Sequence, residues 1–154
     1  MEAFTGLLTG FQIALTPMNL FFCFVGVFIG TLIGVLPGIG TSGTMAILLP
    51  ITMGFPTTSA IIMLSGIYYG ACYGGSTTSI LVNIPGESMS IVTCLDGYQM
   101  ARQGRAGAAL GISAIGSFVA GTLGVVFLGF LAIPITNFAL RFGPPEFFAL
   151  MVVG

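Results

Sequence analysis

The chain has 154 residues, of which 56% are hydrophobic and only 5% carry a charge, and its formal net charge is -1. An ordinary soluble domain carries about 25% charged residues, so this composition excludes a protein whose whole surface faces water. Three arginines without any lysine cannot build the basic surface on which nucleic-acid binding depends, so nucleic acid is excluded as a partner.

The charges are also unevenly distributed along the chain. Residues 3–86 contain no charged side chain at all. A helix that crosses a bilayer needs about 20 mainly apolar residues, and the uncharged run is long enough for several such helices. We therefore expect an all-α integral membrane protein that crosses the lipid bilayer several times.

The first predicted spanning helix covers about residues 18–36. Three of its glycines, Gly26, Gly30 and Gly34, are spaced four residues apart and therefore lie on one face of the helix. Faces of small residues allow membrane helices to approach closely, so packing is the expected role of these glycines.

A first interrupted segment follows, over about residues 37–54. Pro37 and Gly38 break the apolar run, and the helical pattern that resumes at Thr44 lasts for only about ten residues. Ten helical residues rise about 15 Å, which is half of the hydrocarbon core. The pattern predicts a broken or re-entrant helix.

The second spanning helix is predicted over about 57–75, again with glycines on one face, at Gly66, Gly70 and Gly74. A second broken or re-entrant segment is predicted over about 76–95, around Pro85 and Gly86. Interrupted backbone inside a bilayer is tolerated only where it is buried in protein or lines a wet cavity. For the two Pro-Gly breaks we therefore favour a binding role over simple packing.

The rest of the chain predicts a water-facing loop, a spanning helix and an incomplete helix. The loop covers about 96–107 and holds Arg102 and Arg105, so the positive-inside tendency places it in the cytoplasm. The spanning helix covers about 108–133, and an apolar segment that starts at about 145 is too short to cross the bilayer. We expect the chain to be a fragment of a longer membrane protein.

The first break has the spacing of a dinucleotide fingerprint, because Gly38, Gly40 and Gly43 form a literal G-x-G-x-x-G. That fingerprint needs a preceding strand and an acidic residue about 20 positions later. Here the flanks are membrane segments, and the next acid is Glu87. Nucleotide binding is rejected, but glycines at a helix start still suit an anion, because helix N-termini present free N-H groups.

An anion bound within these segments would meet no side-chain cation, so it would depend on backbone N-H groups, hydroxyls and a cation that binds with it. The candidate substrate-binding residues are Pro37, Gly38, Gly40, Thr41, Ser42, Gly43, Ser76, Thr77, Asn83, Pro85 and Gly86. The candidate ion-coupling residues are Asn83 and Glu87, which offer the oxygen ligands that hard cations prefer. The alternative for Glu87 is an ordinary charge at a helix start near the membrane surface, and both interpretations stay open.

Catalysis and structural metal binding have little support in the sequence. The chain lacks histidine and lysine, so a Ser-His-Asp set and a Schiff base are both impossible. Cys23, Cys72 and Cys94 are widely separated among apolar residues, which indicates packing. We predict no enzyme activity, no catalytic residue and no structural metal site.

Five motifs carry a resemblance to a known family. They are Leu36-Pro-Gly-Ile-Gly40, Gly66-Ile-Tyr-Tyr-Gly-Ala-Cys-Tyr-Gly-Gly-Ser76, Asn83-Ile-Pro-Gly-Glu87, Thr93-Cys-Leu-Asp-Gly-Tyr-Gln-Met-Ala-Arg-Gln-Gly-Arg-Ala-Gly107 and Phe142-Gly-Pro-Pro-Glu146. With these motifs in this order, the chain resembles the large membrane subunit of the tripartite tricarboxylate transporters, the TctA type. Members of that family are longer and have two related halves, so the resemblance implies the N-terminal part of a two-halved transporter.

The resemblance implies secondary active transport of citrate-like tricarboxylates or related carboxylate anions across the bacterial inner membrane. A periplasmic solute-binding protein would deliver the substrate, a small membrane subunit would assist, and a sodium ion or a proton would be the coupling ion, with no other cofactor. Two alternatives remain, a membrane scaffold or interaction subunit that does not transport, and a passive anion channel.

Overall fold

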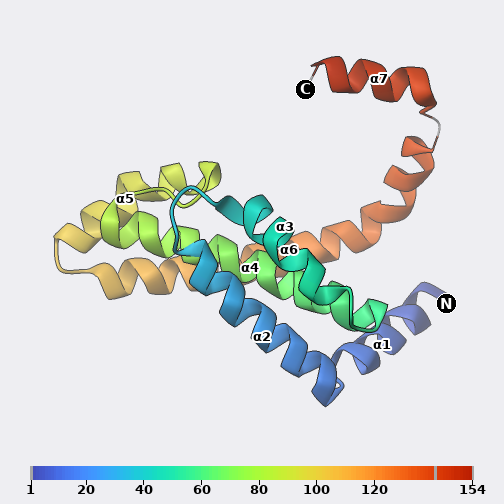
Figure 1. The fold of residues 1–154 in the computed structure, drawn as a ribbon, viewed down its shortest axis with the longest axis horizontal. Helices are drawn as coiled ribbons and strands as arrows, with labels where there is room; N and C mark the ends of the chain where they lie inside the picture. The colour runs from blue at the N-terminus through green and yellow to red at the C-terminus, as the bar shows by residue number, and fades with distance from the viewer. Residues whose placement is uncertain (1, 141, 154) are drawn as a thin grey trace. The chain divides into compact units, whose positions relative to one another are not determined.

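The computed structural model describes residues 2–140 and 142–153, and every element in this part of the chain is a helix (Figure 1). The predicted all-α class is therefore confirmed. The elements are α1 (Glu2–Ala14), α2 (Pro17–Gly34), α3 (Gly40–Thr52), α4 (Thr57–Val82), the short 3-10 helix η1 (Ser88–Ser90), α5 (Ile91–Arg102), α6 (Ala106–Ala139) and α7 (Pro144–Val153). They form two compact units, Met1–Ala114 and Ile115–Gly154.

Two of the described helical stretches are long and apolar enough to cross a membrane. They are Pro17–Gly34, with a mean hydropathy of 1.9, and Ala106–Ala132, with a mean hydropathy of 2.1. No residue of the second stretch's most apolar window is buried, whereas 28% of the first window is. The apolar side chains of these helices thus face outward to a large extent, as expected of surfaces in contact with lipid.

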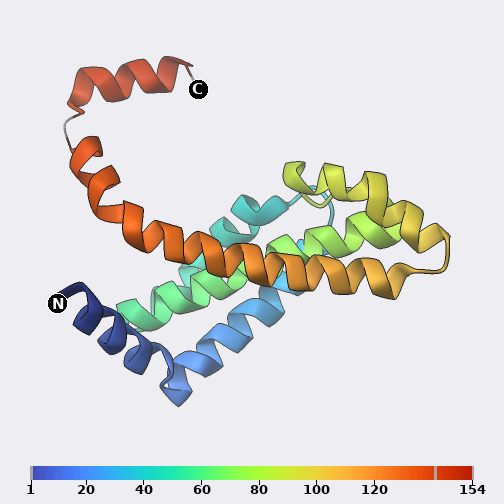
Figure 2. The same cartoon turned by 180° about the vertical axis from the view of Figure 1, so that it is seen from behind.

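The centre of the first unit is the pair formed by α2 and α4, which lie side by side (Figures 1 and 2). The pairing is parallel, because Gly26 of α2 faces Met63 and Gly34 of α2 faces Ala71 farther along α4. Because α2 and α4 run in the same direction, the chain between them must return to the end of the pair at which both helices begin. The shorter helix α3 makes this return and packs on α4.

Glycines determine how closely α2 and α4 approach. A Cβ atom at Gly26, Gly30 or Gly34 would overlap backbone atoms of α4, and a Cβ at Gly66 would lie 2.7 Å from the Cys23 carbonyl oxygen. Only residues without a side chain permit this contact of backbone on backbone. The structure thus supports the packing role predicted for these glycines.

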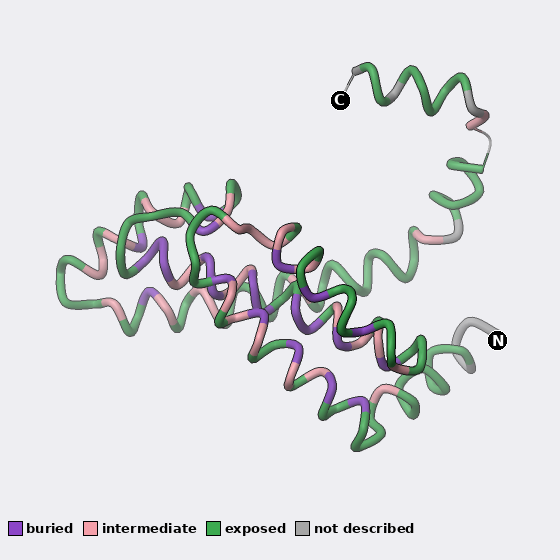
Figure 3. Tube along the Cα trace, in the orientation of Figure 1, coloured by how far each residue is buried: buried purple, intermediate pink, exposed green. Residues whose placement is uncertain are grey.

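The core around this pair is small and partly polar. Phe22, Leu48, Met63 and Ile67 form its buried apolar cluster. Figure 3 shows the buried residues gathered along the helices of the first unit. Most other large apolar side chains are exposed, which is consistent with a chain whose surface contacts lipid or further protein.

The helices differ in extent from the sequence prediction. Helix α4 continues to Val82, so the first third of the predicted broken segment 76–95 is regular helix. Much of the predicted loop 96–107 is also helical, since α5 ends at Arg102 and α6 starts at Ala106. Helix α5 packs on α4, where a Cβ at Gly97 would lie 2.8 Å from the Ile80 side chain. This tertiary contact stabilises a helix in a segment whose charges and glycines favoured a loop.

The second unit contains the remainder of α6 and helix α7. The Phe138 and Phe142 rings lie 5.2 Å apart at the turn between the two helices. The Gly143 N-H donates to the Glu146 carboxylate at 2.8 Å, which places a negative charge at the start of α7, where the helix dipole favours it. The third arginine, Arg141, lies outside the described residues.

Candidate functional site

The first Pro-Gly break separates α2 from α3. Gly38 and Gly40 have positive φ angles of 94° and 66°, which residues with a side chain rarely adopt. A Cβ atom would find open space at both positions. Glycine is therefore required here by backbone conformation, in contrast to the glycines of α2 and α4, which are required by close packing.

The second break separates α4 from α5. Helix α4 ends at Val82 and is capped by Asn83, whose φ of 60° is left-handed, a conformation that asparagine tolerates better than most residues at a helix end. The Glu87 N-H then donates to the Ser90 hydroxyl at 3.2 Å, and that hydroxyl donates to the Glu87 carbonyl at 2.8 Å. These bonds form the tight turn from which η1 starts.

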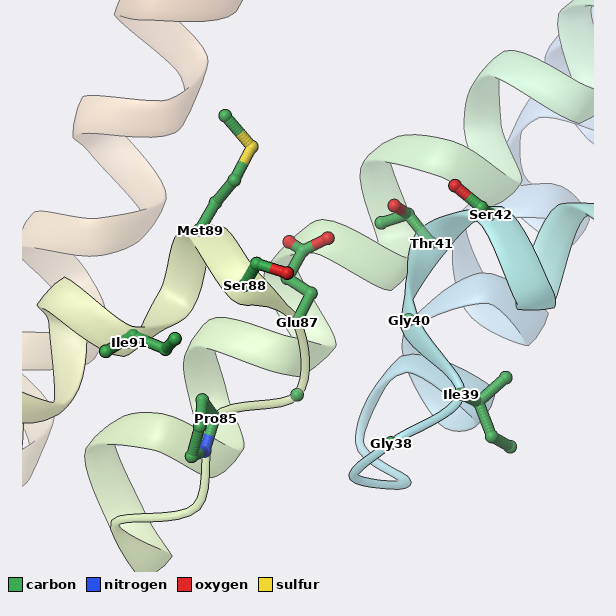
Figure 4. A pocket seen from close by; sticks show the side chains of 11 residues that line it. Gly38, Ile39, Gly40, Thr41, Ser42, Pro85, Glu87, Ser88, Met89 and Ile91 are labelled. Carbon is green, nitrogen blue, oxygen red and sulfur yellow. The ribbon is translucent and has the colours of Figure 1, made fainter. Parts of the chain in front are cut away.

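The two breaks face each other across a cleft of about 520 Å³. Figure 4 shows one wall that carries Thr41 and Ser42 and an opposite wall that carries Glu87 and Ser88. The described lining residues are Gly38, Ile39, Gly40, Thr41, Ser42, Pro85, Gly86, Glu87, Ser88, Met89 and Ile91. Seven predicted site residues thus meet in one place: Gly38, Gly40, Thr41, Ser42, Pro85, Gly86 and Glu87.

The first wall carries hydrogen-bond donors. It is the start of α3, where the first N-H groups of the helix have no partner within the helix, and no side chain caps them. In the described part of the chain, the Thr41 and Ser42 hydroxyls form no hydrogen bond, so they are available to a ligand. This wall offers several donors and the positive end of a helix dipole.

The second wall carries the single charge among the lining residues, the carboxylate of Glu87. The side chain is half-buried and interacts with the Cys72 thiol on α4, which in turn lies near the Tyr68 hydroxyl. Chemically, the cleft combines donors for an anion on one side with a ligand for a cation on the other.

Five predicted site residues lie outside the cleft. The Ser76 hydroxyl donates to the Cys72 carbonyl at 3.1 Å and the Thr77 hydroxyl to the Tyr73 carbonyl at 2.9 Å, so both bond within α4. Pro37 lies in the exposed turn before Gly38, Gly43 lies one position beyond the lining part of α3, and Asn83 is exposed at the end of α4.

Four lining residues were not predicted from the sequence. Ile39, Ser88, Met89 and Ile91 flank the Pro-Gly motifs. Met89 and Ile91 are 81% and 53% exposed, so the cleft has an apolar rim beside its polar walls. Their nearness to the motifs in sequence was the available signal, but their residue types resemble those of any membrane segment.

Within the described residues, no group of three or more histidine, cysteine, aspartate or glutamate side chains could hold a metal ion. A cation in the cleft would therefore have one carboxylate as its charged ligand, supplemented by hydroxyl and carbonyl oxygens. Such weak, oxygen-based coordination suits an exchangeable ion better than a permanent one.

Comparison with known proteins identifies the family of the chain. Residues 20–154 match a family of membrane transporters that consist of several components. The family is described as the tripartite tricarboxylate transporter TctA family, and the chain belongs to it.

A protein of Agrobacterium vitis named "Uncharacterized 52.8 kDa protein in TAR-I ttuC' 3'region" is 59% identical over 154 residues. The alignment covers 100% of the present chain and 31% of that relative, so the chain spans about a third of the relative's length. No solved structure matches the chain.

Proposed function

We propose that the chain forms one side of the substrate site in a secondary active transporter for citrate-like tricarboxylates or related carboxylate anions. The observation that carries this proposal is the cleft in which both Pro-Gly breaks meet. Its α3 wall offers N-H groups and the Thr41 and Ser42 hydroxyls to a carboxylate group. Interrupted helices of secondary transporters bind anionic substrates in this way, with half-helix N-termini.

The charge of Glu87 supports cation coupling. At an effective dielectric constant of about 20, two like charges about 4 Å apart repel each other by about 4 kcal/mol. A substrate carboxylate in the cleft is therefore disfavoured unless a cation binds between it and Glu87, or unless Glu87 is protonated. Either event links entry of the anion to entry of a sodium ion or a proton, which is the requirement for symport.

The remaining parts of the proposal concern the whole protein. We place it in the bacterial inner membrane as a multi-pass subunit, assisted by a small membrane subunit and supplied with substrate by a periplasmic binding protein. The family's tripartite description supports such partners. Because the chain corresponds to 31% of its relative, the opposite side of the site would come from the rest of the longer protein.

Uptake of labelled citrate and of smaller carboxylates into vesicles tests this proposal. The vesicles should contain the full-length protein with its partner proteins, and sodium and proton gradients should be imposed separately. We expect one of the two gradients to drive accumulation of the labelled carboxylate. In Glu87→Gln, that gradient should no longer increase the accumulation. The matched control is Glu146→Gln, which alters a carboxylate outside the cleft.

The same assay separates the alternatives. A passive channel would equilibrate the anion at the same rate with and without either gradient, and a scaffold subunit would leave substrate affinity unaltered in every cleft variant. Gradient-driven uptake that persists unchanged in Glu87→Gln would refute the assignment of coupling to this carboxylate.

A further inference from the structure

One turn of α4, from Gly74 to Thr78, contacts the end of α2, where the first break begins, and also the second break at Gly86, although these segments are far apart in the sequence. The Thr78 hydroxyl and the glycines Gly74 and Gly75 of this turn make different contacts. None of Gly74, Gly75 and Thr78 lines the cleft. The turn nevertheless contacts the segments from which the cleft walls start.

The first break is attached to this turn by a side-chain bond and by a backbone contact. The Thr78 hydroxyl shares its one proton between the Val35 carbonyl at 2.9 Å and the Gly74 carbonyl at 3.2 Å. The Val35 carbonyl belongs to the end of α2, where carbonyls lack partners within the helix. A Cβ at Gly74 would lie 2.5 Å from the Thr31 carbonyl oxygen, so no side chain separates the two helices here.

The second break packs on the same turn mainly through the backbone of two glycines. A Cβ at Gly86 would lie 2.5 Å from the Gly75 Cα atom and 3.2 Å from the Gly34 carbonyl oxygen. Gly86 is therefore wedged between α4 and the end of α2, and it is buried. A Cβ at Gly75 would lie 3.7 Å from Glu87 Cγ, so the candidate coupling residue also lies close to this turn.

We propose that the turn Gly74–Thr78 is a common anchor that fixes the spacing between the two walls of the cleft, with Gly75 and Thr78 as positioning residues. Backbone contacts leave no flexible side chain to absorb movement, so both walls shift together with α4. For transport, the anchor would fix in advance the distance between the hydrogen-bond donors at the start of α3 and the Glu87 carboxylate. This consequence rests on the proposed function, whereas the anchoring itself does not.

The first experiment compares two replacements of Thr78 in the uptake assay with the full-length protein. Thr78→Val keeps the shape of the side chain but loses the hydroxyl, and Thr78→Ser keeps the hydroxyl. We expect Thr78→Val to raise the apparent KM for the coupling cation and for citrate up to about tenfold, since that is the upper range for one hydrogen bond. Thr78→Ser should restore the wild-type KM.

Thr31→Val is the matched control, because the Thr31 hydroxyl donates at 2.8 Å to the Val27 carbonyl within its own helix. A general loss of stability would lower the amount of assembled protein in all variants and leave KM unchanged. Equal KM values in Thr78→Val, Thr31→Val and the wild type would overturn the positioning role.

The second experiment measures the distance between the two cleft walls and does not depend on transport. Spin labels at Ala46→Cys on α3 and Val92→Cys on α5, both exposed positions, report the distance between the elements that carry the two walls in the reconstituted full-length protein. The native cysteines are replaced beforehand. We expect a narrow distance distribution in the labelled protein that retains Thr78, and a broader or shifted distribution in the labelled Thr78→Val variant.

Gly75 is tested in the same way. Gly75→Ala should preserve the distribution, because its methyl group would meet Gly86 and Glu87 only at 3.5–3.8 Å. Gly75→Val extends beyond that space and should displace the second wall. Identical distributions in Thr78→Val, Gly75→Val and the wild type would refute the anchor. Altered distances in a protein that shows no gradient-driven uptake would uphold the anchor and reject the proposed function instead.

Discussion

Gly30 of α2 and Ile67 of α4 touch through their backbones, and a Cβ atom at Gly30 would overlap the Ile67 carbonyl group. Ile67 is completely buried, so the contact lies at the centre of the first unit. The absence of a side chain at Gly30 thus permits the close approach of the two helices at this level.

Gly30→Ala is expected to destabilise the full-length protein by about 1–3 kcal/mol, because the added methyl group must push α2 away from α4. Thermal unfolding of the purified protein in detergent measures the effect. Gly10→Ala is the control, since a Cβ there meets no atom within 4 Å and alanine favours the helix. Equal unfolding temperatures for the two variants would contradict the close packing.

Gly40 requires a left-handed backbone, so its replacements should differ according to their tolerance of positive φ. Gly40→Asn should be mild, because asparagine adopts this conformation, whereas Gly40→Val should cost at least about 1–2 kcal/mol and impair uptake. Unfolding temperature and apparent KM for citrate are measured for both. A valine variant that behaves like the asparagine variant would show that the turn has another conformation.

Asn19 and Ser59 form a buried hydrogen bond between α2 and α4, in which the Ser59 hydroxyl donates to the Asn19 side-chain oxygen at 2.7 Å. Asn19 also donates to the Ile13 carbonyl at 2.8 Å. Asn19→Leu leaves both partners unsatisfied and should cost about 1–3 kcal/mol of unfolding free energy. A double-mutant cycle with Ser59→Ala should give a coupling energy of at least about 0.5 kcal/mol.

Ser65→Ala serves as the control for that cycle. The Ser65 hydroxyl is exposed and donates at 2.9 Å to the Ile61 carbonyl of its own helix. Its replacement should leave the unfolding temperature nearly unchanged. A coupling energy near zero between Asn19 and Ser59 would mean that their hydrogen bond does not form in the membrane.

Asn83 terminates α4 with a left-handed backbone and lies outside the cleft. Asn83→Gly should therefore keep citrate uptake close to that of the wild type, because glycine ends a helix equally well. Asn83→Val should impair folding and uptake together. A selective rise in the KM for the coupling ion in Asn83→Gly would instead support the ligand role expected from the sequence.

The helical faces were predictable because they follow from local periodicity. Glycines four residues apart lie on one face of any α-helix, so Gly26, Gly30 and Gly34 indicate a packing surface without knowledge of the fold. Their partners were not predictable. The contact of Gly30 with Ile67 depends on α3 returning the chain so that α2 and α4 become parallel neighbours.

The extent of the helices was predicted less well than their existence. Glycines, hydroxyl residues and charges suggested that the helix ends near residue 75 and that a loop covers 96–107. Helix propensity is a weak signal that packing overrides, and contacts with α4 keep α5 helical to Arg102. Because α4 continues to Val82, the Ser76 and Thr77 hydroxyls bond to carbonyls within α4 and do not line the cleft.

The sequence by itself determined the environment, the all-helical class and the positions of the two breaks. An uncharged run of this length suits only a membrane, and proline with glycine interrupts a helix wherever it occurs. Only the tertiary structure decided that the breaks face each other and that Glu87 stands opposite Thr41 and Ser42, with Asn83 outside. Contacts between distant segments arise from the path of the chain and from close fitting at Gly34, Gly75 and Gly86, and neither is encoded in a local pattern.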